Sequence, residues 1–289
     1  MQKKLLLSVF TATIILAIAV GPVAAITGDF VQDYTHPYVG LVVFYDTNGE
    51  FLWRCSGTLI SPYTLLTAGH CTNTAEGAVT ARVYFQQDAG VNYDPVLGYD
   101  PVTGYPEFCA PGTEGTLCAT ASTILKYGST GSFTLPQTYD VGLVILDQPI
   151  YMSAYGQLPE PDLLDQYVTA RGTQDLLFTV SGYGLTYKQQ AQNGKPSISY
   201  RERLMAEATL VNLNSALNAG FNLQTNGNGA GKGGTCNGDS GGPVFLGGYN
   251  SDLVVAVTSF GLNSLCRGTD FAYRIDQPDV LAWIDANKK

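Results

Sequence analysis

Apolar runs in this chain are short, and turn-forming residues end nearly all of them. The 289 residues include 33 glycines, 14 prolines and 18 tyrosines. Glycine and proline favour tight turns, whereas tyrosine and β-branched residues favour strands. Because long amphipathic runs are few, the pattern predicts an all-β fold of short antiparallel strands.

Individual segments support this prediction. The run 39–45 (VGLVVFY) ends in Asp46-Thr47-Asn48-Gly49, and Asn-Gly is a strong signal for a hairpin whose return strand is 51–60. Further strands are expected at 63–68, 79–86, 141–146, 176–182, 207–213, 243–246 and 253–260. Residues 276–287 predict a C-terminal helix, capped by Asp276 or Asp279 and packed on the outside of the second half.

Composition sets the size of the core and the division of the chain. With 45% hydrophobic and 13% charged residues, the chain can bury a large core, near the size of one large or two small all-β domains. Pro149, Pro159 and Pro161 indicate a linker. We therefore expect two halves, about 26–148 and about 160–289.

The first 25 residues have the pattern of a secretory signal peptide. Lys3 and Lys4 precede an apolar run over 5–20, and Val23-Ala24-Ala25 is a small-residue cleavage site. The alternative, an uncleaved membrane anchor, is disfavoured because the run is short for a bilayer span. Cleavage removes two lysines and no acid, so the mature net charge is more negative than −9. We expect a secreted, extracellular protein that binds neither nucleic acid nor membranes in its mature form.

The six cysteines are an even number on an exported chain, which favours three disulfides over metal ligands or free buried thiols. They are Cys55, Cys71, Cys109, Cys118, Cys236 and Cys266. The chain has no zinc-finger or EF-hand spacing, so the sequence predicts neither a metal site nor a cofactor.

An unusual segment follows the expected strand at 79–86. Residues 93–98 (YDPVLG) are nearly repeated as 99–104 (YDPVTG), and Cys109 and Cys118 lie close behind. The segment 93–118 is expected to form a protruding loop pinned by a disulfide, either a surface decoration or a substrate-contacting exosite. Asp94 and Asp100 are only a weak indication of calcium binding.

The segment 235–243 (TCNGDSGGP) carries a candidate nucleophile, Ser240, on a glycine-rich turn. A serine hydroxyl is a poor nucleophile unless a base takes its proton and donors stabilise the oxyanion that it forms. Only two histidines exist, and His36 lies in a polar His-Pro-Tyr segment predicted to be a solvated loop. His70, where a strand gives way to a loop, is therefore the predicted base, and Asp140 at the head of a buried strand is the candidate carboxylate.

Three motifs resemble those of the chymotrypsin/trypsin-like serine proteases. They are Thr67-Ala68-Gly69-His70-Cys71, Asp140-Val141-Gly142-Leu143 in place of the usual Asp-Ile-Ala-Leu, and Gly238-Asp239-Ser240-Gly241-Gly242-Pro243. Their order along the chain is the order of that family, whereas other triad hydrolases use different orders. The resemblance runs from about Ile26 to the C-terminal helix.

The resemblance implies a fold of two packed antiparallel β-barrels of the six-stranded type, with the active cleft between them and a C-terminal helix. It implies a monomeric serine endopeptidase that cleaves polypeptides through an acyl-enzyme. Ser240 would be the nucleophile, His70 the base and Asp140 the group that orients the imidazole. The N–H groups of Gly238 and Ser240 would form the oxyanion hole.

The same resemblance implies the cysteine pairs and an activation step. The pairs are Cys55 with Cys71, Cys236 with Cys266, and Cys109 with Cys118. Signal cleavage would free Ile26, whose ammonium would pair with Asp239 without removal of a further propeptide. The chain departs from the family here, because it has Ile-Thr-Gly-Asp where Ile-Val-Gly-Gly is usual.

Specificity follows less directly from the resemblance. Gly234 stands where trypsin has the aspartate at the base of its pocket, with Thr235 beside it, and Asp270 falls on the opposite wall. Asp270 would either attract a basic side chain or fill the pocket and favour small apolar ones. The segment Ser259-Phe260-Gly261 matches the strand that pairs with substrate backbone. Two other functions remain open: a non-catalytic homologue that acts as a binding module, and an esterase with the same triad.

Overall fold

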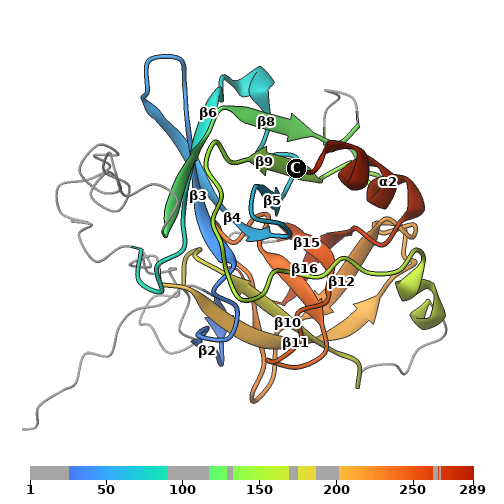
Figure 1. Cartoon of the computed structure of the whole chain (residues 1–289). Coiled ribbons are helices and arrows are strands. Elements are labelled where there is room, and N and C mark those ends of the chain that lie inside the picture. Colours follow the sequence, from blue (N-terminus) through green and yellow to red (C-terminus); the bar gives the residue numbers. More distant parts are fainter. Residues whose placement is uncertain are drawn as a thin grey trace, which may run out of the picture.

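Two antiparallel β-sheets, each curled into a barrel, make up most of the chain (Figure 1). The computed structural model describes residues 26–89, 117–128, 133–168, 175–186, 202–262, 266 and 268–289. The predicted signal peptide, most of the 93–118 loop, Cys109, Asp94 and Asp100 lie outside these residues. No helix among the described residues is long and apolar enough to cross a membrane.

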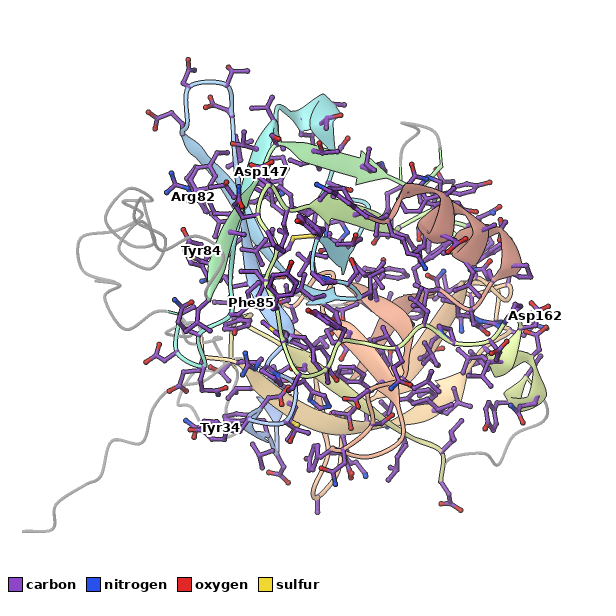
Figure 2. All side chains as sticks on the ribbon, viewed as in Figure 1. Tyr34, Arg82, Tyr84, Phe85, Asp147 and Asp162 are labelled. Carbon is purple, nitrogen blue, oxygen red and sulfur yellow. A yellow bond between two sulfur atoms is a disulfide. The ribbon has the colours of Figure 1, made fainter. Side chains whose placement is uncertain are left out.

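The first sheet has the strand order β7-β6-β3-β4-β5-β9-β8 and is nearly closed. Its strands are β3 (Val39–Tyr45), β4 (Phe51–Leu59), β5 (Thr64–Thr67), β6 (Thr80–Tyr84), β7 (Cys118–Ala121), β8 (Thr123–Lys126) and β9 (Gly142–Ile145). Only Ser122 separates β7 from β8, and Asp147 accepts hydrogen bonds from its N–H and Oγ at 3.1 and 2.7 Å (Figure 2). β7 and β8, which lie at the two ends of the sheet, are therefore parts of one bent strand. Counting them as one strand gives the six strands that a barrel of this type has.

The second sheet has the order β10-β14-β15-β16-β12-β11-β2, and pairing of β10 with β11 closes it. Its strands are β2 (Val31–Gln32), β10 (Leu177–Gly182), β11 (Leu204–Asn212), β12 (Asn222–Asn226), β14 (Pro243–Leu246), β15 (Val254–Gly261) and β16 (Thr269–Arg274). A short pair, β1 (Thr27–Gly28) and β13 (Gly233–Gly234), joins the start of the described chain to the second half. The 3-10 turns are η1 (Thr74–Glu76) and η3 (Leu163–Tyr167). The predicted all-β fold of two barrels is confirmed.

The C-terminal helix α2 (Pro278–Asn287) contacts the first barrel as well as the second half. Tyr127, which follows β8, donates a hydrogen bond to Asp279 Oδ2 at 2.6 Å and packs edge-on against Trp283. Val280 and Ile284 belong to the same core cluster as the first barrel. The same cluster contains Phe245, Val257 and Tyr273 of the second half, so the apolar face of the helix belongs to a core that both barrels share.

The N-cap of this helix is neither of the two predicted aspartates. Gln277 occupies the N-cap position without a side-chain cap bond, and Pro278 follows it. Asp276 instead pairs with the buried Arg274 at 2.7 Å and accepts the N–H of Leu164. Leaving a buried guanidinium without a carboxylate lowers the stability of the fold more than leaving a helix start without a side-chain cap.

Candidate active site

The pairing of β5 with β9 brings His70 and Asp140 together. Thr67, the last residue of β5, lies opposite Gly142, the first residue of β9. His70 follows the one strand and Asp140 precedes the other, so the two side chains emerge at the same edge of the first barrel. The imidazole Nδ1 lies 2.9 Å from Asp140 Oδ2, and the backbone N–H of His70 donates to Oδ1 at 2.7 Å.

Asp140 is buried, with 1% of its side chain exposed, whereas 38% of the His70 side chain is exposed. Burial alone raises the pKa of Asp140, but the facing imidazole and a hydrogen bond from Ser259 Oγ outweigh it and leave the pKa lowered. Burial lowers the pKa of His70, and the charge of Asp140 more than offsets this, so the net pKa is raised. Each group of the pair therefore stabilises the charged form of the other.

Ser240 lies on the turn that precedes β14 in the second barrel. Its carbonyl oxygen accepts the N–H of Ser56 at 2.8 Å and lies 3.8 Å from Cys71 Sγ, next to His70. In the described part of the chain, no hydrogen bond joins the Ser240 hydroxyl to His70. The structure thus places the serine turn against the residue that follows the histidine, across the junction of the two barrels.

Ser56 fixes this turn and was missed by sequence reasoning. Its Oγ donates to the Gly238 carbonyl and accepts the N–H of Tyr183, both at 2.9 Å. These partners lie 182 and 127 residues away, so no local pattern signals the contact. Ser259 was predicted only as a pocket residue, yet its hydroxyl donates to Asp140.

The backbone of the turn leaves two N–H groups unused. Gly238 adopts a φ of 97°, a conformation that favours glycine. Among the described residues, neither the N–H of Gly238 nor that of Ser240 makes a hydrogen bond, whereas the neighbouring N–H groups of Asp239 and Gly241 do. Two free donors beside a serine are what an oxyanion site requires.

A cavity of about 320 Å³ opens beside the turn. It is lined by residues 235–237 and 240, the β15 end 258–262, Cys266, Thr269 and Asp270. Asp270 is 9% exposed and its Oδ2 accepts the N–H of Thr235 at 2.7 Å. Burial raises its pKa to about 6. The predicted pocket residues Thr235, Ser259, Phe260, Gly261 and Asp270 all line this cavity, but Gly234 does not.

Two disulfides brace the site. Cys55 is joined to Cys71, beside His70, and Cys236 is joined to Cys266 across the pocket wall. Cys118 is also disulfide-bonded, while its predicted partner Cys109 lies outside the described residues. Cys55, Cys71 and His70 lie within metal-binding reach of one another, but the two sulfurs are bonded to each other and so are not thiolate ligands.

Asp239 is completely buried, and its carboxylate accepts the N–H groups of Gly184 and Cys236 at 2.8 and 2.9 Å. Burial raises its pKa to about 7, which these two hydrogen bonds only partly offset. Ile26 is buried as well. Its nitrogen is part of the peptide bond to Ala25 and carries no charge, and no ion pair joins Ile26 to Asp239 among the described residues.

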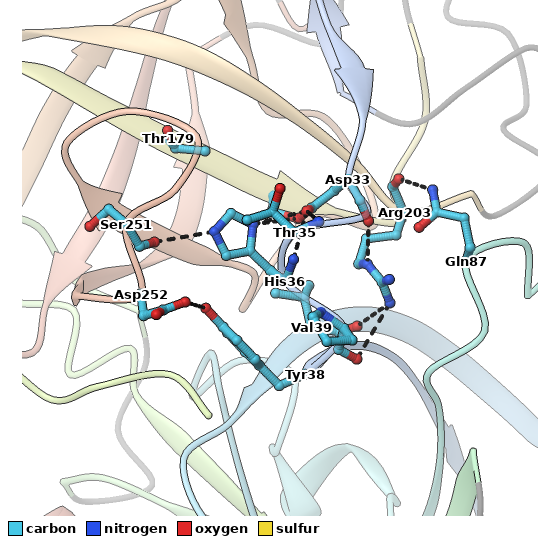
Figure 3. Close-up of polar contacts among 12 residues, drawn as sticks. Asp33, Thr35, His36, Tyr38, Val39, Gln87, Thr179, Arg203, Ser251 and Asp252 are labelled. Carbon is cyan, nitrogen blue, oxygen red and sulfur yellow. Dashed lines mark hydrogen bonds and ion pairs between the residues drawn. The ribbon is translucent and has the colours of Figure 1, made fainter. Parts of the chain in front are cut away.

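The prediction that His36 lies in a solvated loop is wrong. It is 0% exposed and stacks on Phe245. Its Nδ1 lies 2.9 Å from the Asp33 carboxylate, which also accepts the hydroxyl of Ser181, and its Nε2 lies 3.2 Å from the Ser251 carbonyl (Figure 3). Because the burial comes from strands of the second barrel, the local sequence does not reveal it.

The chain is similar to known proteins in sequence and in fold. A sequence profile of the trypsin family matches residues 25–284. Phenoloxidase-activating factor 3 of Holotrichia diomphalia is 27% identical over 266 residues, which cover 87% of this chain and 69% of that protein.

Two solved structures share the fold. HL collagenase superposes with a TM-score of 0.60 at 19% identity, covering 90% of this chain and 96% of the other. Protease Anisep from Arthrobacter nicotinovorans superposes with a TM-score of 0.54 at 18% identity, covering 89% and 97%. The profile match extends over most of the sequence, so the chain belongs to the trypsin family of serine proteases.

Proposed function

We propose that this chain is a catalytically active, secreted serine endopeptidase that cleaves polypeptides through an acyl-enzyme. The observation that carries the proposal is the hydrogen-bonded pair of His70 and the buried Asp140, set against the Ser240 turn. The unused N–H groups of Gly238 and Ser240 support it further. Catalytic hydrogen bonds are often long or misaligned before substrate binds, so the missing Ser240–His70 bond does not argue against the assignment.

Each residue has a defined role in the proposed reaction. Ser240 Oγ attacks the scissile carbonyl carbon while His70 Nε2 takes the hydroxyl proton, and the Gly238 and Ser240 N–H groups stabilise the oxyanion. Collapse of this intermediate breaks the C–N bond, and His70 returns the proton to the departing amine. Water then hydrolyses the ester by the same steps in reverse. Asp140 holds the imidazole in its working tautomer and remains ionised throughout.

For the side chain that enters the 320 Å³ cavity, we propose a lysine or arginine. Asp270 is the acid among the residues that line the cavity, and its neighbours Thr235, Thr258 and Ser259 are polar. A carboxylate with a pKa of about 6 is mostly ionised at neutral pH. A preference for small apolar residues, the other prediction, would leave this buried charge with the N–H of Thr235 as a partner but without a counter-charge.

For activation, we propose that cleavage after Ala25 frees the Ile26 amine to pair with Asp239. Burial raises the pKa of Asp239 to about 7 despite its two backbone hydrogen bonds, which supports a role for an added positive charge beside it. N-terminal sequencing of the active secreted protein tests the step, and a start at any other residue contradicts it.

Labelling with a fluorophosphonate probe tests the proposed function. The probe should modify Ser240 in the folded wild-type protein, and peptide cleavage should require the same residue. Ser240→Ala should abolish both, while Ser251→Ala, a serine outside the site, should retain both. Failure to label folded protein would favour a non-catalytic binding module, and hydrolysis of esters without peptides would favour an esterase.

A further inference from the structure

A second cavity, of about 480 Å³, lies on the first-barrel side of the oxyanion turn, residues 238–240. Residues 51–54 of β4 form one wall, and Leu185, Asn237 and Gly238 form the other. The cavity that contains Asp270 draws its walls from the second barrel and shares only Asn237 with this one. The two cavities therefore flank the catalytic turn, one on each barrel.

The direction of the bound peptide follows from this placement. When the residue before the scissile bond enters the cavity that contains Asp270 and its carbonyl oxygen meets the Gly238 and Ser240 N–H groups, the residues after the bond must run past Gly238 towards β4. The second cavity is therefore where the departing side of the substrate lies.

Arg54 gives this cavity its charge. Its Nε lies 3.6 Å from the position that a Cβ on Gly238 would take, so the guanidinium borders the oxyanion turn. Its Nη1 is buried and has no hydrogen-bond partner, and no salt bridge joins Arg54 to an acid in the described part of the chain. The wall beside it, residues 51–53, consists of Phe, Leu and Trp.

A buried guanidinium donor without an acceptor is unfavourable, and a carboxylate is its best partner because the hydrogen bond is then charge-assisted. Asp239 lies within electrostatic range but already accepts two backbone N–H groups. Arg54 lines the cavity and has no ion pair with an acid of the described residues, so its guanidinium charge is available to a carboxylate that enters the cavity.

We propose that Arg54 selects substrates that carry an aspartate or glutamate side chain within the first two residues after the scissile bond. The inference rests on the proposed endopeptidase function. It concerns the residues after the scissile bond, whereas Asp270 acts on the residue before that bond.

The test uses peptide pairs that differ only in Glu or Gln at the first or the second position after the bond, with acetylated and amidated ends so that no terminal carboxylate competes. In the wild-type enzyme, kcat/KM for the Glu peptide should exceed that for the Gln peptide about tenfold at one of these positions. The ratio should shrink as salt is added. Because it is a ratio within one enzyme, a general loss of activity in a variant cancels.

Arg54→Gln should lower the ratio to about one, and Arg54→Lys should keep most of it because the charge remains. Arg82 on β6, whose guanidinium lies over the Tyr45 ring outside the cavity, is the matched control, and Arg82→Gln should keep the full ratio (Figure 2). Equal cleavage of both peptides by the wild type, or a ratio that survives Arg54→Gln, overturns the inference while the proposed function stands. Absence of both cleavage and fluorophosphonate labelling overturns both.

Discussion

The carboxylate of Asp270 occupies the space that a side chain at Gly234 would need. A Cβ on Gly234 would lie 2.5 Å from Asp270 Oδ2, which is closer than atoms can approach. Asp270 lines the cavity and Gly234 does not, so the acid beside this cavity lies on β16 and not on the segment before Ser240. The glycine and the aspartate form a matched pair.

This relationship predicts the outcome of exchanging the two residues. Asp270→Gly alone should reduce the preference for Lys over Gln before the scissile bond by roughly 10- to 100-fold, the value of a charge-assisted contact. The double change Gly234→Asp with Asp270→Gly should restore much of it, because an acid at position 234 would take the space that the Asp270 carboxylate leaves. Cleavage of matched Lys and Gln peptides measures both. An unchanged preference in Asp270→Gly would contradict the assignment.

The same preference should depend on pH. The pKa of Asp270 is raised by burial to about 6, so the carboxylate is ionised above that value and neutral below it. The ratio of kcat/KM for Lys and Gln peptides should therefore fall as pH drops through about 6, and the ratio removes the separate effect of His70. In Asp270→Asn the ratio should stay flat; a parallel fall in that variant would locate the titration elsewhere.

Asp140→Asn should lower kcat by about 10⁴, the loss known for this change in Ser-His-Asp proteases. Burial lowers the pKa of His70 and the charge of Asp140 raises it above its ordinary value. Removing the charge should therefore move the acid limb of the residual activity to lower pH. A pH–rate profile of both proteins checks the shift, and an acid limb that stays in place would show that Asp140 does not set the protonation of His70.

Freeing Ile26 should stabilise the protein in a pH-dependent way. A carboxyl whose pKa rises on folding, as that of Asp239 does to about 7, lowers stability as pH increases from its unfolded value of 3.8 through 7. An Ile26 ammonium would offset this cost. The form that starts at Ile26 should have a Tm about 5 °C higher at pH 8 than a form that retains Ala25, and the difference should be smaller at pH 5. Equal Tm values at pH 8 would contradict the ion pair.

The buried cluster of Asp33, His36 and Ser181 should contribute strongly to the free energy of unfolding. Asp33→Ala leaves His36 and Ser181 without their acceptor and should lower the free energy of unfolding by about 3 to 5 kcal/mol. Asp285→Ala, which removes an exposed ion pair with Lys288, should cost less than about 1 kcal/mol. Urea unfolding measures both.

The contribution of Asp33 also has a defined pH window. Burial raises the pKa of Asp33, but the His36 contacts outweigh it and the net pKa is lowered. The stabilisation is therefore present above 3.8, the unfolded value, and is lost as pH falls through the lowered folded value. The difference between Asp33→Ala and wild type should shrink in that acid range and nowhere between pH 5 and 7.

Sequence reasoning was most successful where local pattern decides structure. The strand at 39–45 is β3 in full, and 243–246 is β14, because alternating or continuous apolar residues bounded by turn residues allow little else. It failed for His36 and did not show that the helix also contacts the first barrel, because burial there comes from segments far away in the sequence. Arg54, Ser56 and the second role of Ser259 carried no signal at all, since each depends on contacts between the barrels.

By itself, the sequence determined an all-β fold, the family, and which histidine and serine are the candidates for catalysis, because motifs and strand periodicity are local properties. Only the tertiary structure decided what surrounds them. It placed Asp270 opposite Gly234, left the Gly238 and Ser240 N–H groups without a partner among the described residues, and set Arg54 beside the oxyanion turn. Charge, burial and hydrogen-bond satisfaction at these positions arise between strands of two barrels, and no single stretch of chain contains them.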